Sequence, residues 1–300
     1  MRILLIRPGA LGDTILSLPI VEAITQKHPG SVITLLGSKQ YGFLMPDGVM
    51  TEAFDSPKWA WIFENSSTGK ALIPEHFDLA YVILKESRQI VNNLKNAGIQ
   101  TVQASSNPVE GQSIVETICH RLSLPAPEKK PYLERLRLAK TSRRAWIGPG
   151  SGSRKKNASI KILSQTYKLL RNHCRLDLVV TLGEPDLWLL EDSGFQEFVK
   201  ETKAEAVANT SLDIVVATYC NSCIYIGNDS GVSHLAAALG IPSIVFFKTT
   251  SPEVWGPWTT EQNLLKIRLT EDSDEQNPGL DTLYSQVLLF AEKHLSNPVF

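Results

Sequence analysis

The sequence has no long hydrophobic run and almost no net charge, and both absences restrict the class of protein. No apolar stretch reaches the roughly 18 residues that a membrane-spanning helix needs. The formal net charge of −1 gives no general attraction to nucleic acid. The opening segment is apolar but contains Arg7 and Asp13, so we interpret it as the first strand and helix of the fold rather than as a signal peptide.

Cysteine is scarce, and its spacing favours neither zinc binding nor redox chemistry. Cys220 and Cys223 form one Cys-x-x-Cys, but no second pair follows, and the pair precedes a predicted strand whereas a redox motif opens a helix. We interpret the four cysteines as small buried hydrophobes of a reducing compartment. No group of His, Cys and Asp has the spacing of metal ligands, so we expect no metal.

Three familiar site motifs are also missing. The sequence contains no G-x-S-x-G and no Walker A motif, which argues against a hydrolase nucleophile elbow and a P-loop. It contains no G-x-G-x-x-G either, which argues against a plain NAD-dependent oxidoreductase. Any phosphate-binding site must therefore use other loops.

The first half of the chain has the pattern of an open α/β sheet. Residues 2–6 and 32–36 are apolar and predict strands, and residues 14–27 between them have apolar positions at helical spacing. Residues 7–13 form a glycine-containing turn after the first strand, where open α/β sheets place their sites. Residues 37–76 show no regular pattern.

The second half repeats the α/β pattern after a Pro-rich linker at 125–131. We therefore predict a doubly wound α/β protein with two Rossmann-like domains, at 1–135 and 136–300, facing an interdomain cleft. A C-terminal helix at 283–295 could pack back on the first domain. The remaining predicted elements are strands at 77–84, 99–102, 145–147, 176–182, 224–226, 243–247 and 264–269, with helices at 87–97, 110–122, 160–172 and 212–219.

Residues 223–247 have the most informative local pattern, a strand, a tight turn, a short helix and a second strand. Asp229 and Ser230 are good helix N-caps, and Gly231 allows a ligand to approach the backbone. Gly240 ends the helix as a C′ residue. Because a helix start at the edge of a parallel sheet presents bare N–H groups, the pattern favours binding of an anion such as a diphosphate.

A second candidate anion site lies in the Gly- and Ser-rich loop 148–156, where backbone N–H groups could surround phosphate oxygens and a lysine could neutralise them. The alternative is a solvated surface loop. Residues 129–161 contain eleven Lys and Arg against the single acid Glu134. That asymmetry fits either attraction of an anionic substrate or a solvated linker face.

Asp13 and His234 each have two interpretations. The sequence alone favours Asp13 as the N-cap of the first helix, and the alternative is a general base that deprotonates an acceptor hydroxyl. His234 is either a buried core histidine or a donor to a phosphate or sugar hydroxyl.

Two longer motifs resemble the ADP-heptose:lipopolysaccharide heptosyltransferases, glycosyltransferase family 9. The first is ILLIRPGALGDTILSLP at residues 3–19. The second is IGNDSGVSHLAAALGIPSIVFF at 226–247, with TTSP at 249–252 and WGP at 255–257. The combination is specific, and the resemblance covers essentially the whole chain.

The resemblance implies a GT-B fold, with the acceptor bound by the N-terminal domain and the nucleotide-sugar donor by the C-terminal one. It implies an inverting, metal-independent glycosyltransferase whose donor is ADP-heptose or another nucleotide-sugar, with no other cofactor. The acceptor would be a lipopolysaccharide-core, lipid-linked or anionic glycan, and the location cytoplasmic, with peripheral contact at the inner membrane surface. The residues that match the family are Asp13 as general base, Gly9, Ala10 and Gly12 on the acceptor side, and, around the donor, Gly150, Ser151, Lys155, Lys156, Glu184, Thr210, Asp229, Ser230, Gly231, Val232 and His234.

The chain departs from the family beside the expected donor pocket. The family segment Lys-x-Trp-Pro is here Lys155-Lys156-Asn157-Ala158, which keeps a lysine but loses Trp and Pro. We expect Lys155 to be the catalytic lysine, with Lys156 as the alternative. Lys248 stands where the family usually has glycine. These changes leave two other functions open, a catalytically inactive nucleotide-sugar-binding protein and a GT-B-like nucleotide-sugar epimerase.

Overall fold

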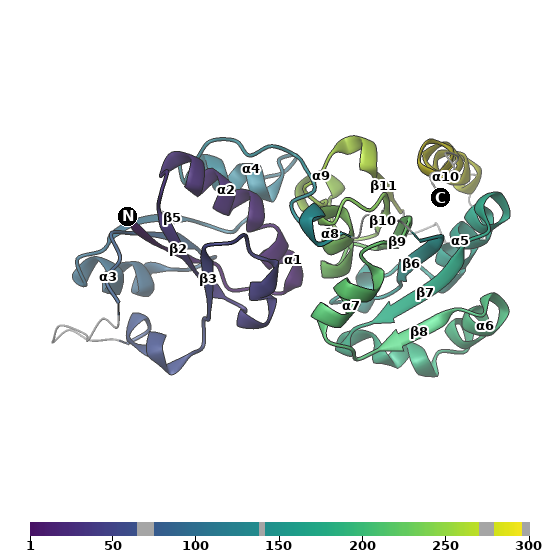
Figure 1. The fold of residues 1–300 in the computed structure, drawn as a ribbon, viewed down its shortest axis with the longest axis horizontal. Coiled ribbons are helices and arrows are strands. Elements are labelled where there is room, and N and C mark those ends of the chain that lie inside the picture. Colours follow the sequence, from purple (N-terminus) through teal and green to yellow (C-terminus); the bar gives the residue numbers. More distant parts are fainter. Residues whose placement is uncertain (65–74, 138–141, 270–278, 296–300) are drawn as a thin grey trace. The chain divides into compact units, whose positions relative to one another are not determined.

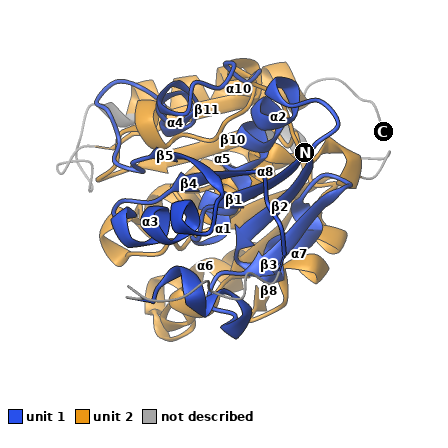
Figure 2. Cartoon of the chain, turned by 90° about the vertical axis from the view of Figure 1, so that its left-hand side faces the viewer, with its two compact units in different colours: residues 1–128 blue, residues 129–300 orange. Residues whose placement is uncertain are grey.

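The structure is a computed structural model of the chain, and it describes residues 1–64, 75–137, 142–269 and 279–295. The chain divides into two compact units, Met1–Glu128 and Lys129–Phe300 (Figures 1 and 2). The division precedes the predicted boundary after residue 135. One reason is that the backbone N–H of Leu133 donates to Ala238 O, at 2.7 Å, which attaches the end of the Pro-rich segment to the second unit.

Unit 1 contains a five-stranded parallel sheet with the order β3-β2-β1-β4-β5. Strands β1 and β4 are central, and their side chains are buried almost throughout, as expected for a parallel sheet covered on both faces. The sequence order reverses between β1 and β4, so the loops after these strands diverge. The elements are β1 (Arg2–Ile6), α1 (Leu11–Ile15), α2 (Leu18–Lys27), β2 (Val32–Gly37), the 3₁₀ helix η1 (Lys39–Leu44), β3 (Val49–Ala53), η2 (Pro57–Ile62), β4 (Leu79–Ile83), α3 (Arg88–Asn96), β5 (Gln100–Ala104) and α4 (Ile114–Arg121).

The predicted single helix at 14–27 is wrong, because two helices occupy this stretch. Helix α1 ends at Ile15 and α2 begins at Leu18, with Pro19 in its first turn. Proline has no N–H, and its ring would clash with the carbonyl four residues earlier in a continuous helix. The hydroxyl of Ser17 donates to Asp13 O at 2.8 Å and satisfies one carbonyl at the break.

Unit 2 contains a six-stranded parallel sheet with the order β11-β10-β9-β6-β7-β8. The sequence order reverses between β6 and β9, which pair in parallel from Ala145–Ile224 to Gly148–Gly227. The elements are η3 (Glu134–Leu136), β6 (Arg144–Gly148), η4 (Arg154–Lys156), α5 (Ile160–Cys174), β7 (Asp177–Leu182), η5 (Glu184–Glu191), α6 (Ser193–Thr202), β8 (Glu205–Ala208), α7 (Leu212–Tyr219), β9 (Ile224–Asn228), α8 (Gly231–Ala238), β10 (Ser243–Phe247), α9 (Pro252–Trp255), η6 (Glu261–Asn263), β11 (Leu264–Arg268) and α10 (Gly279–Leu295).

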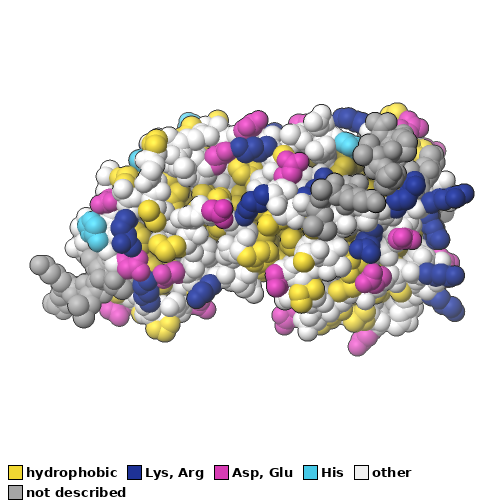
Figure 3. Space-filling view, viewed as in Figure 1, with side chains coloured by type: hydrophobic (Ala, Val, Ile, Leu, Met, Phe, Trp, Pro, Cys, Tyr) yellow, Lys and Arg dark blue, Asp and Glu magenta, His cyan; other side chains and the backbone are white. Residues whose placement is uncertain are grey.

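Each unit has its own hydrophobic core beside its sheet. The core of unit 1 includes Leu4, Trp59 and Phe77, and that of unit 2 includes Tyr167 and Phe246. Helix α10 packs on α5 and β11. No helix in the described ranges combines the length and apolarity needed to cross a bilayer. Positive and negative side chains are interspersed on the face drawn in Figure 3.

Candidate functional site

The loops after β6 and β9 form the centre of the candidate site in unit 2, since they diverge where the strand order reverses. Crevices at such reversal points are where open α/β sheets bind ligands. Asn228, at the end of β9, is fully buried and joins the two loops. Its Nδ2 donates to Pro149 O at 2.6 Å, and its Oδ1 accepts from the Ala158 N–H at 2.8 Å. One side chain therefore holds both ends of the loop after β6.

Two facing glycines make room beneath these loops. Gly148 and Gly227 are register partners on β6 and β9, and the ring of Tyr225 lies over both of them. A Cβ on Gly227 would lie 2.2 Å from the Tyr225 hydroxyl, and one on Gly148 would lie 2.4 Å from it. Burial raises the pKa of Tyr225, so the phenol stays protonated. The glycines are therefore required by packing, and they bring the two loops close together.

Helix α8 begins as the sequence predicts. Ser230 is its N-cap, and the Ser230 hydroxyl and Ser233 side chain form a reciprocal capping box. Within the described chain, no group accepts a hydrogen bond from the N–H of Gly231 or Val232. The positive end of the helix dipole adds to these donors. The start of α8 can therefore receive an anion.

Asp229 is the centre of a buried polar cluster and not a helix cap. Its side chain is 6% exposed, and its carboxylate accepts from the Thr250 hydroxyl at 2.7 Å and from Lys156 Nζ at 3.0 Å. His234 Nε2 lies 4.0 Å from the other carboxylate oxygen, and its side chain is 7% exposed. The cluster joins the loops after β6, β9 and β10, which fixes Lys156 beside the start of α8.

The two candidate lysines differ in their surroundings. Lys156 is partly buried and paired with Asp229, whereas Lys155 is exposed. No described residue forms an ion pair or hydrogen bond with Lys155, so its ammonium is available to a ligand. Neighbouring Arg154 lies over the Trp188 ring at 4.1 Å. The two lysines thus differ: Lys156 is held in an ion pair, and Lys155 extends into solvent.

Part of the basic stretch at 129–161 makes structural contacts. Lys129 pairs with Glu261 at 2.9 Å, and the guanidinium of Arg137 donates to Gly240 O at 2.9 Å. Lys129 also lies over the Trp258 ring. Both residues therefore have protein partners within unit 2.

Asp186 is a half-buried carboxylate in this site that was not predicted from the sequence. Its Oδ1 accepts from the Ser151 N–H at 3.1 Å. A Cβ on Gly150 would lie 1.9 Å from the Asp186 carboxyl carbon, so only glycine allows this approach. Burial raises the pKa of Asp186 from its usual 3.8 to about 6, although backbone hydrogen bonds from Ser151 and Gly183 lower it. The Asp186 carboxylate thus already accepts the hydrogen bond of one backbone N–H in the loop 148–156, which was predicted to bind phosphate.

Glu184 and Thr210 lie farther along the same edge of the sheet. Glu184 follows β7 and is exposed, and Thr210 follows the edge strand β8. The Thr210 hydroxyl donates weakly to Ala208 O at 3.4 Å. Both residues therefore lie at the carboxyl edge of the sheet, on the side of β6 where β7 and β8 lie. A ligand that begins at α8 and extends across β6 would reach this part of the edge.

Unit 1 carries Asp13 at the carboxyl end of β1. The prediction that Asp13 is the N-cap of the first helix is wrong: the cap is Ala10, and Asp13 lies in the first turn of α1. The helix starts earlier than predicted because Leu11 and Gly12 already have helical geometry. The Asp13 side chain is 46% exposed and lies 3.6 Å from the guanidinium of buried Arg7. Arg7 also donates through Nε to Asp13 O at 3.3 Å.

The turn before α1 fits closely around Asp13. A Cβ on Gly9 would lie 2.5 Å from the Asp13 Cβ, so glycine is required there. The hydroxyl of Ser38 donates to Gly9 O at 3.0 Å and fixes the turn to the loop after β2. Ala10 is exposed, and Gly12 is half-buried. The carboxylate of Asp13 is thus held at the surface by its neighbours.

Within the ranges that the structure describes, no cluster of three or more His, Cys, Asp or Glu side chains could hold a metal ion.

Sequence reasoning missed Asn228, Thr250 and Asp186 as site residues. Asn228 and Thr250 both belong to the quoted family motifs. Each is a polar residue at or just after the end of a predicted strand, and that position could have identified it as a site residue. Asp186 lies four residues after the end of a predicted strand at 176–182, and nothing else in the local sequence marks it.

Comparison with known proteins adds a family and a fold. Residues 189–279 match the family model described as glycosyltransferase family 9 (heptosyltransferase). No curated protein matches the chain. The matched range includes Asp229, His234 and Thr250 of the buried polar cluster, whereas Lys156 lies outside it.

Solved structures match over nearly the full length. E. coli heptosyltransferase WaaC with ADP is 16% identical, with a TM-score of 0.68, covering 98% of this chain and 100% of that one. A glycosyl transferase family 9 protein from Veillonella parvula is 18% identical, with a TM-score of 0.68, covering 98% and 97%. E. coli ADP-heptose lps heptosyltransferase II is 17% identical, with a TM-score of 0.65, covering 99% of both chains.

At these identities the structural matches establish the fold, which is GT-B with two Rossmann-like domains. The predicted fold class is therefore confirmed. The family match over residues 189–279 and the shared fold both agree with the resemblance predicted from the sequence.

Proposed function

We propose that the protein is an inverting, metal-independent glycosyltransferase that moves a heptose or related sugar from an ADP-sugar to a glycan acceptor. One observation carries the donor assignment. The two open N–H groups at the start of α8 lie beside a loop that supplies Lys155 and Lys156. Backbone donors, a helix dipole and ammonium groups together match the charge of a nucleoside diphosphate.

The proposed reaction is a single displacement. Asp13 takes a proton from an acceptor hydroxyl, whose oxygen attacks the anomeric carbon of the donor sugar. The bond from that carbon to the diphosphate breaks, and ADP leaves with the electron pair. Inversion follows because the new bond forms on the face opposite the leaving group.

Each group has a separate electrostatic task in this step. The leaving diphosphate gains negative charge in the transition state, where the exposed ammonium of Lys155 and the N–H groups of Gly231 and Val232 stabilise it. The paired Lys156 positions the loop through Asp229. Asp13 is 46% exposed, which leaves its carboxylate accessible to an acceptor.

The substrates of related proteins guide the finer assignment. ADP is bound by WaaC, a protein with the same fold, which supports an adenine nucleotide as donor here. By the same resemblance, we propose a lipopolysaccharide-core or other lipid-linked, anionic glycan as acceptor. Such an acceptor would place the enzyme in the cytoplasm, in contact with the inner face of the membrane.

The donor assignment is tested by thermal unfolding with nucleotides. A ligand that binds only the native state raises the melting temperature by mass action. ADP should raise it more than UDP or GDP at equal concentration. Lys155→Ala should reduce the ADP effect, whereas Lys200→Ala, which removes an exposed lysine from α6, should not. Equal shifts with all three nucleotides would exclude selective ADP binding.

The assignment of Asp13 is tested by turnover. Asp13→Asn should lower the transfer rate about 10²- to 10⁴-fold, as expected for loss of a general base. The ADP-induced rise in melting temperature should stay unchanged, because Asp13 belongs to unit 1. Near-normal turnover of the variant would show that another group accepts the proton.

A second candidate is a nucleotide-sugar-binding protein without transferase activity. It is favoured by the pairing of Lys156 with Asp229, which leaves a single unpaired lysine in a segment that lacks the family's Trp and Pro. Calorimetry that shows ADP binding, together with no transfer to any glycan lacking the sugar, would support it. Release of an epimerised sugar without acceptor would instead indicate an epimerase.

A further inference from the structure

A carboxylate already lies on one of the backbone donors of the Gly- and Ser-rich loop after β6. Asp186 Oδ1 accepts a hydrogen bond from the Ser151 N–H at 3.1 Å. Within the described chain, no group accepts from the neighbouring N–H groups of Gly150 and Gly152. Because Gly150 has no Cβ, the Asp186 carboxyl group can lie directly against the loop backbone. The carboxylate thus lies where the loop would otherwise present an N–H to a phosphate oxygen.

The loop is also held in shape by contacts that do not involve Asp186. The Ser151 hydroxyl lies within hydrogen-bonding distance of Asn157 Oδ1, at 2.6 Å, and of Ser153 O, at 2.8 Å. Asn228 bonds to both ends of the loop. A change at Asp186 therefore frees the Ser151 N–H while the rest of the loop stays supported.

No cation balances the charge of the Asp186 carboxylate. It forms no ion pair with any residue that the structure describes, and its hydrogen bonds come from the backbone N–H groups of Ser151 and Gly183. Burial, the largest cause, raises the pKa of Asp186 to about 6, although these two N–H groups lower it. The carboxylate therefore takes up a proton more readily than an exposed aspartate does.

Other titratable groups of the candidate site leave this charge uncompensated. The phenol of Tyr225 stays protonated, because burial and the charges of Asp186 and Asp229 raise its pKa. The ammonium of Lys156 is paired with Asp229. The full set around Asp186 is Tyr225 on β9, Asp229 after it, His234 on α8, Arg154, Lys155 and Lys156 on η4, and Glu184 and Glu191 on η5.

A phosphate oxygen and an ionised carboxylate cannot share the Ser151 N–H, because two negative charges beside one donor repel each other. We infer that Asp186 is an internal competitor for the donor's diphosphate, which binds to the loop when Asp186 takes up a proton from solvent. The inference rests on the proposed function, and it adds a residue that controls donor affinity. Once protonated, the carboxyl group no longer repels the diphosphate and can donate its O–H to a phosphate oxygen.

The size of the effect follows from the fraction of Asp186 that carries the proton. With a pKa of about 6, about 3% of Asp186 is protonated at pH 7.5 and about 90% at pH 5.0. If only the protonated form admits the ligand, the apparent ADP affinity is reduced about 30-fold at pH 7.5 and hardly at all at pH 5.0. Because Asp186 is partly exposed and solvent screens its charge, we expect a reduction of about tenfold at pH 7.5.

The test is calorimetric titration of the full-length protein with ADP at pH 5.0 and pH 7.5. Asp186→Asn should bind ADP about tenfold more tightly than the wild type at pH 7.5, and within about twofold of it at pH 5.0. Glu191→Gln removes an exposed carboxylate from the same element and should bind ADP as the wild type does at both pH values. Comparison at equal pH cancels the titration of ADP itself and of other groups, His234 included.

Proton uptake gives a second readout. ADP binding at pH 7.0 is measured in buffers of different ionisation enthalpy, and the wild type should take up at least about half a proton more than Asp186→Asn. Equal proton uptake by the two proteins overturns the inference. Weaker ADP binding by Asp186→Asn at pH 7.5 also overturns it, because the carboxylate would then accept hydrogen bonds from the ligand instead of competing with it.

Pyrophosphate, which has no nucleoside, separates this inference from the donor assignment. Asp186→Asn should gain affinity for pyrophosphate at pH 7.5 as it does for ADP. If pyrophosphate shows the gain but ADP binds to none of the proteins, the donor assignment alone fails. If ADP binds to all three proteins alike at both pH values, the inference about Asp186 alone fails.

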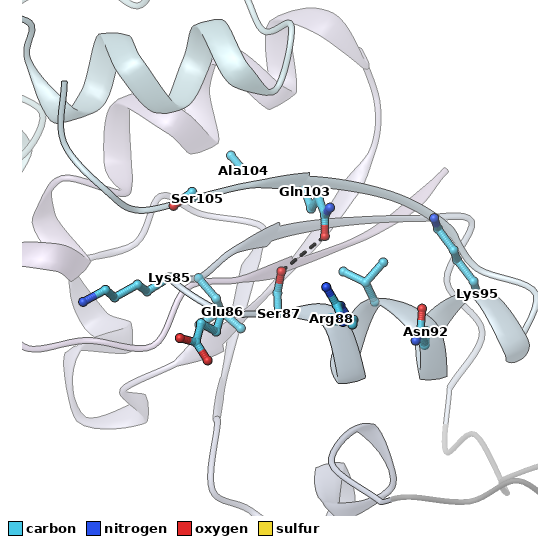
Figure 4. A pocket seen from close by; sticks show the side chains of 11 residues that line it. Lys85, Glu86, Ser87, Arg88, Asn92, Lys95, Gln103, Ala104 and Ser105 are labelled. Carbon is cyan, nitrogen blue, oxygen red and sulfur yellow. Dashed lines mark hydrogen bonds between the residues drawn. The ribbon is translucent and has the colours of Figure 1, made fainter.

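Unit 1 offers another place where pyrophosphate could bind. The pocket between α3 and β5 is lined by side chains that include Lys85, Arg88 and Lys95 (Figure 4). The pyrophosphate titrations are therefore repeated with Arg88→Glu added to the wild type and to Asp186→Asn. The gain from Asp186→Asn should persist in this background. A gain that disappears would place the bound anion in unit 1 and overturn the inference.

Discussion

The half-buried carboxylate of Asp186 predicts a pH-dependent gain in stability when its charge is removed. Asp186→Asn keeps an oxygen that can accept from the Ser151 N–H and changes the volume little. In the wild type, burial raises the pKa of Asp186 from its usual 3.8 to about 6. The folded protein therefore binds this proton more tightly than the unfolded chain does, so ionisation at neutral pH costs folding free energy.

The sign and size of the effect follow from proton linkage. The contribution of Asp186 to stability is fully present below about pH 4 and is lost as the pH rises through about 6. For a fully buried group, this shift would correspond to about 3 kcal/mol. Because Asp186 is only about half-buried, solvent screening reduces the expected gain of Asp186→Asn at pH 7.5 to about 1 kcal/mol.

Urea unfolding at pH 4.0 and pH 7.5 measures the difference. We expect Asp186→Asn to be about 1 kcal/mol more stable than the wild type at pH 7.5 and nearly equal to it at pH 4.0, where Asp186 is protonated. Glu184→Gln removes an exposed charge two residues away and should change stability little at either pH. A loss of stability on Asp186→Asn at pH 7.5 would refute the reasoning, because it would mean that the carboxylate charge stabilises the loop.

Three further substitutions test the packing of the proposed donor site. Asn228→Ala leaves two buried backbone groups unsatisfied and should cost about 3 kcal/mol in urea unfolding; a cost below about 1 kcal/mol would mean that water replaces the side chain. Gly227→Ala inserts a methyl group against the Tyr225 hydroxyl and should cost about 1–3 kcal/mol in thermal unfolding, with full stability contradicting the packing described. Ser230→Ala removes the cap of α8 and should cost about 1 kcal/mol in the same assay, while an unchanged melting temperature would show that the cap is dispensable.

The sequence predicted the central strands well because burial on both faces produces continuous apolar runs. Strands β9 and β10, for example, are fully buried and were placed within two residues. Two of the four edge strands, β3 and β8, were not predicted, whereas β5 and β11 were. Strands β3 and β8 are only partly buried, so their sequences lack a continuous apolar run and an alternating pattern. Helix α6 between β7 and β8 was missed with them.

The same distinction applies to the candidate site. Ser230 was identified as a cap because capping depends on residues three positions apart. Asn228 and Asp186 were not identified, because their partners are distant in the sequence: Asn228 bonds to Pro149, and Asp186 bonds to Ser151. Contacts between loops that only the folded sheet brings together leave no local pattern for a sequence to show.

The role of Asn228 has a consequence for exchanging parts between related enzymes. A chimera that transplants only the segment from Pro149 to Ala158 must present its carbonyl and amide to a side chain that belongs to a different segment. If the host lacks an asparagine at that place, the graft is left with two unmet hydrogen bonds and an unanchored loop after β6. Attempts to alter the ligand preference of this candidate site should therefore move the segment after β6 and the segment after β9 together.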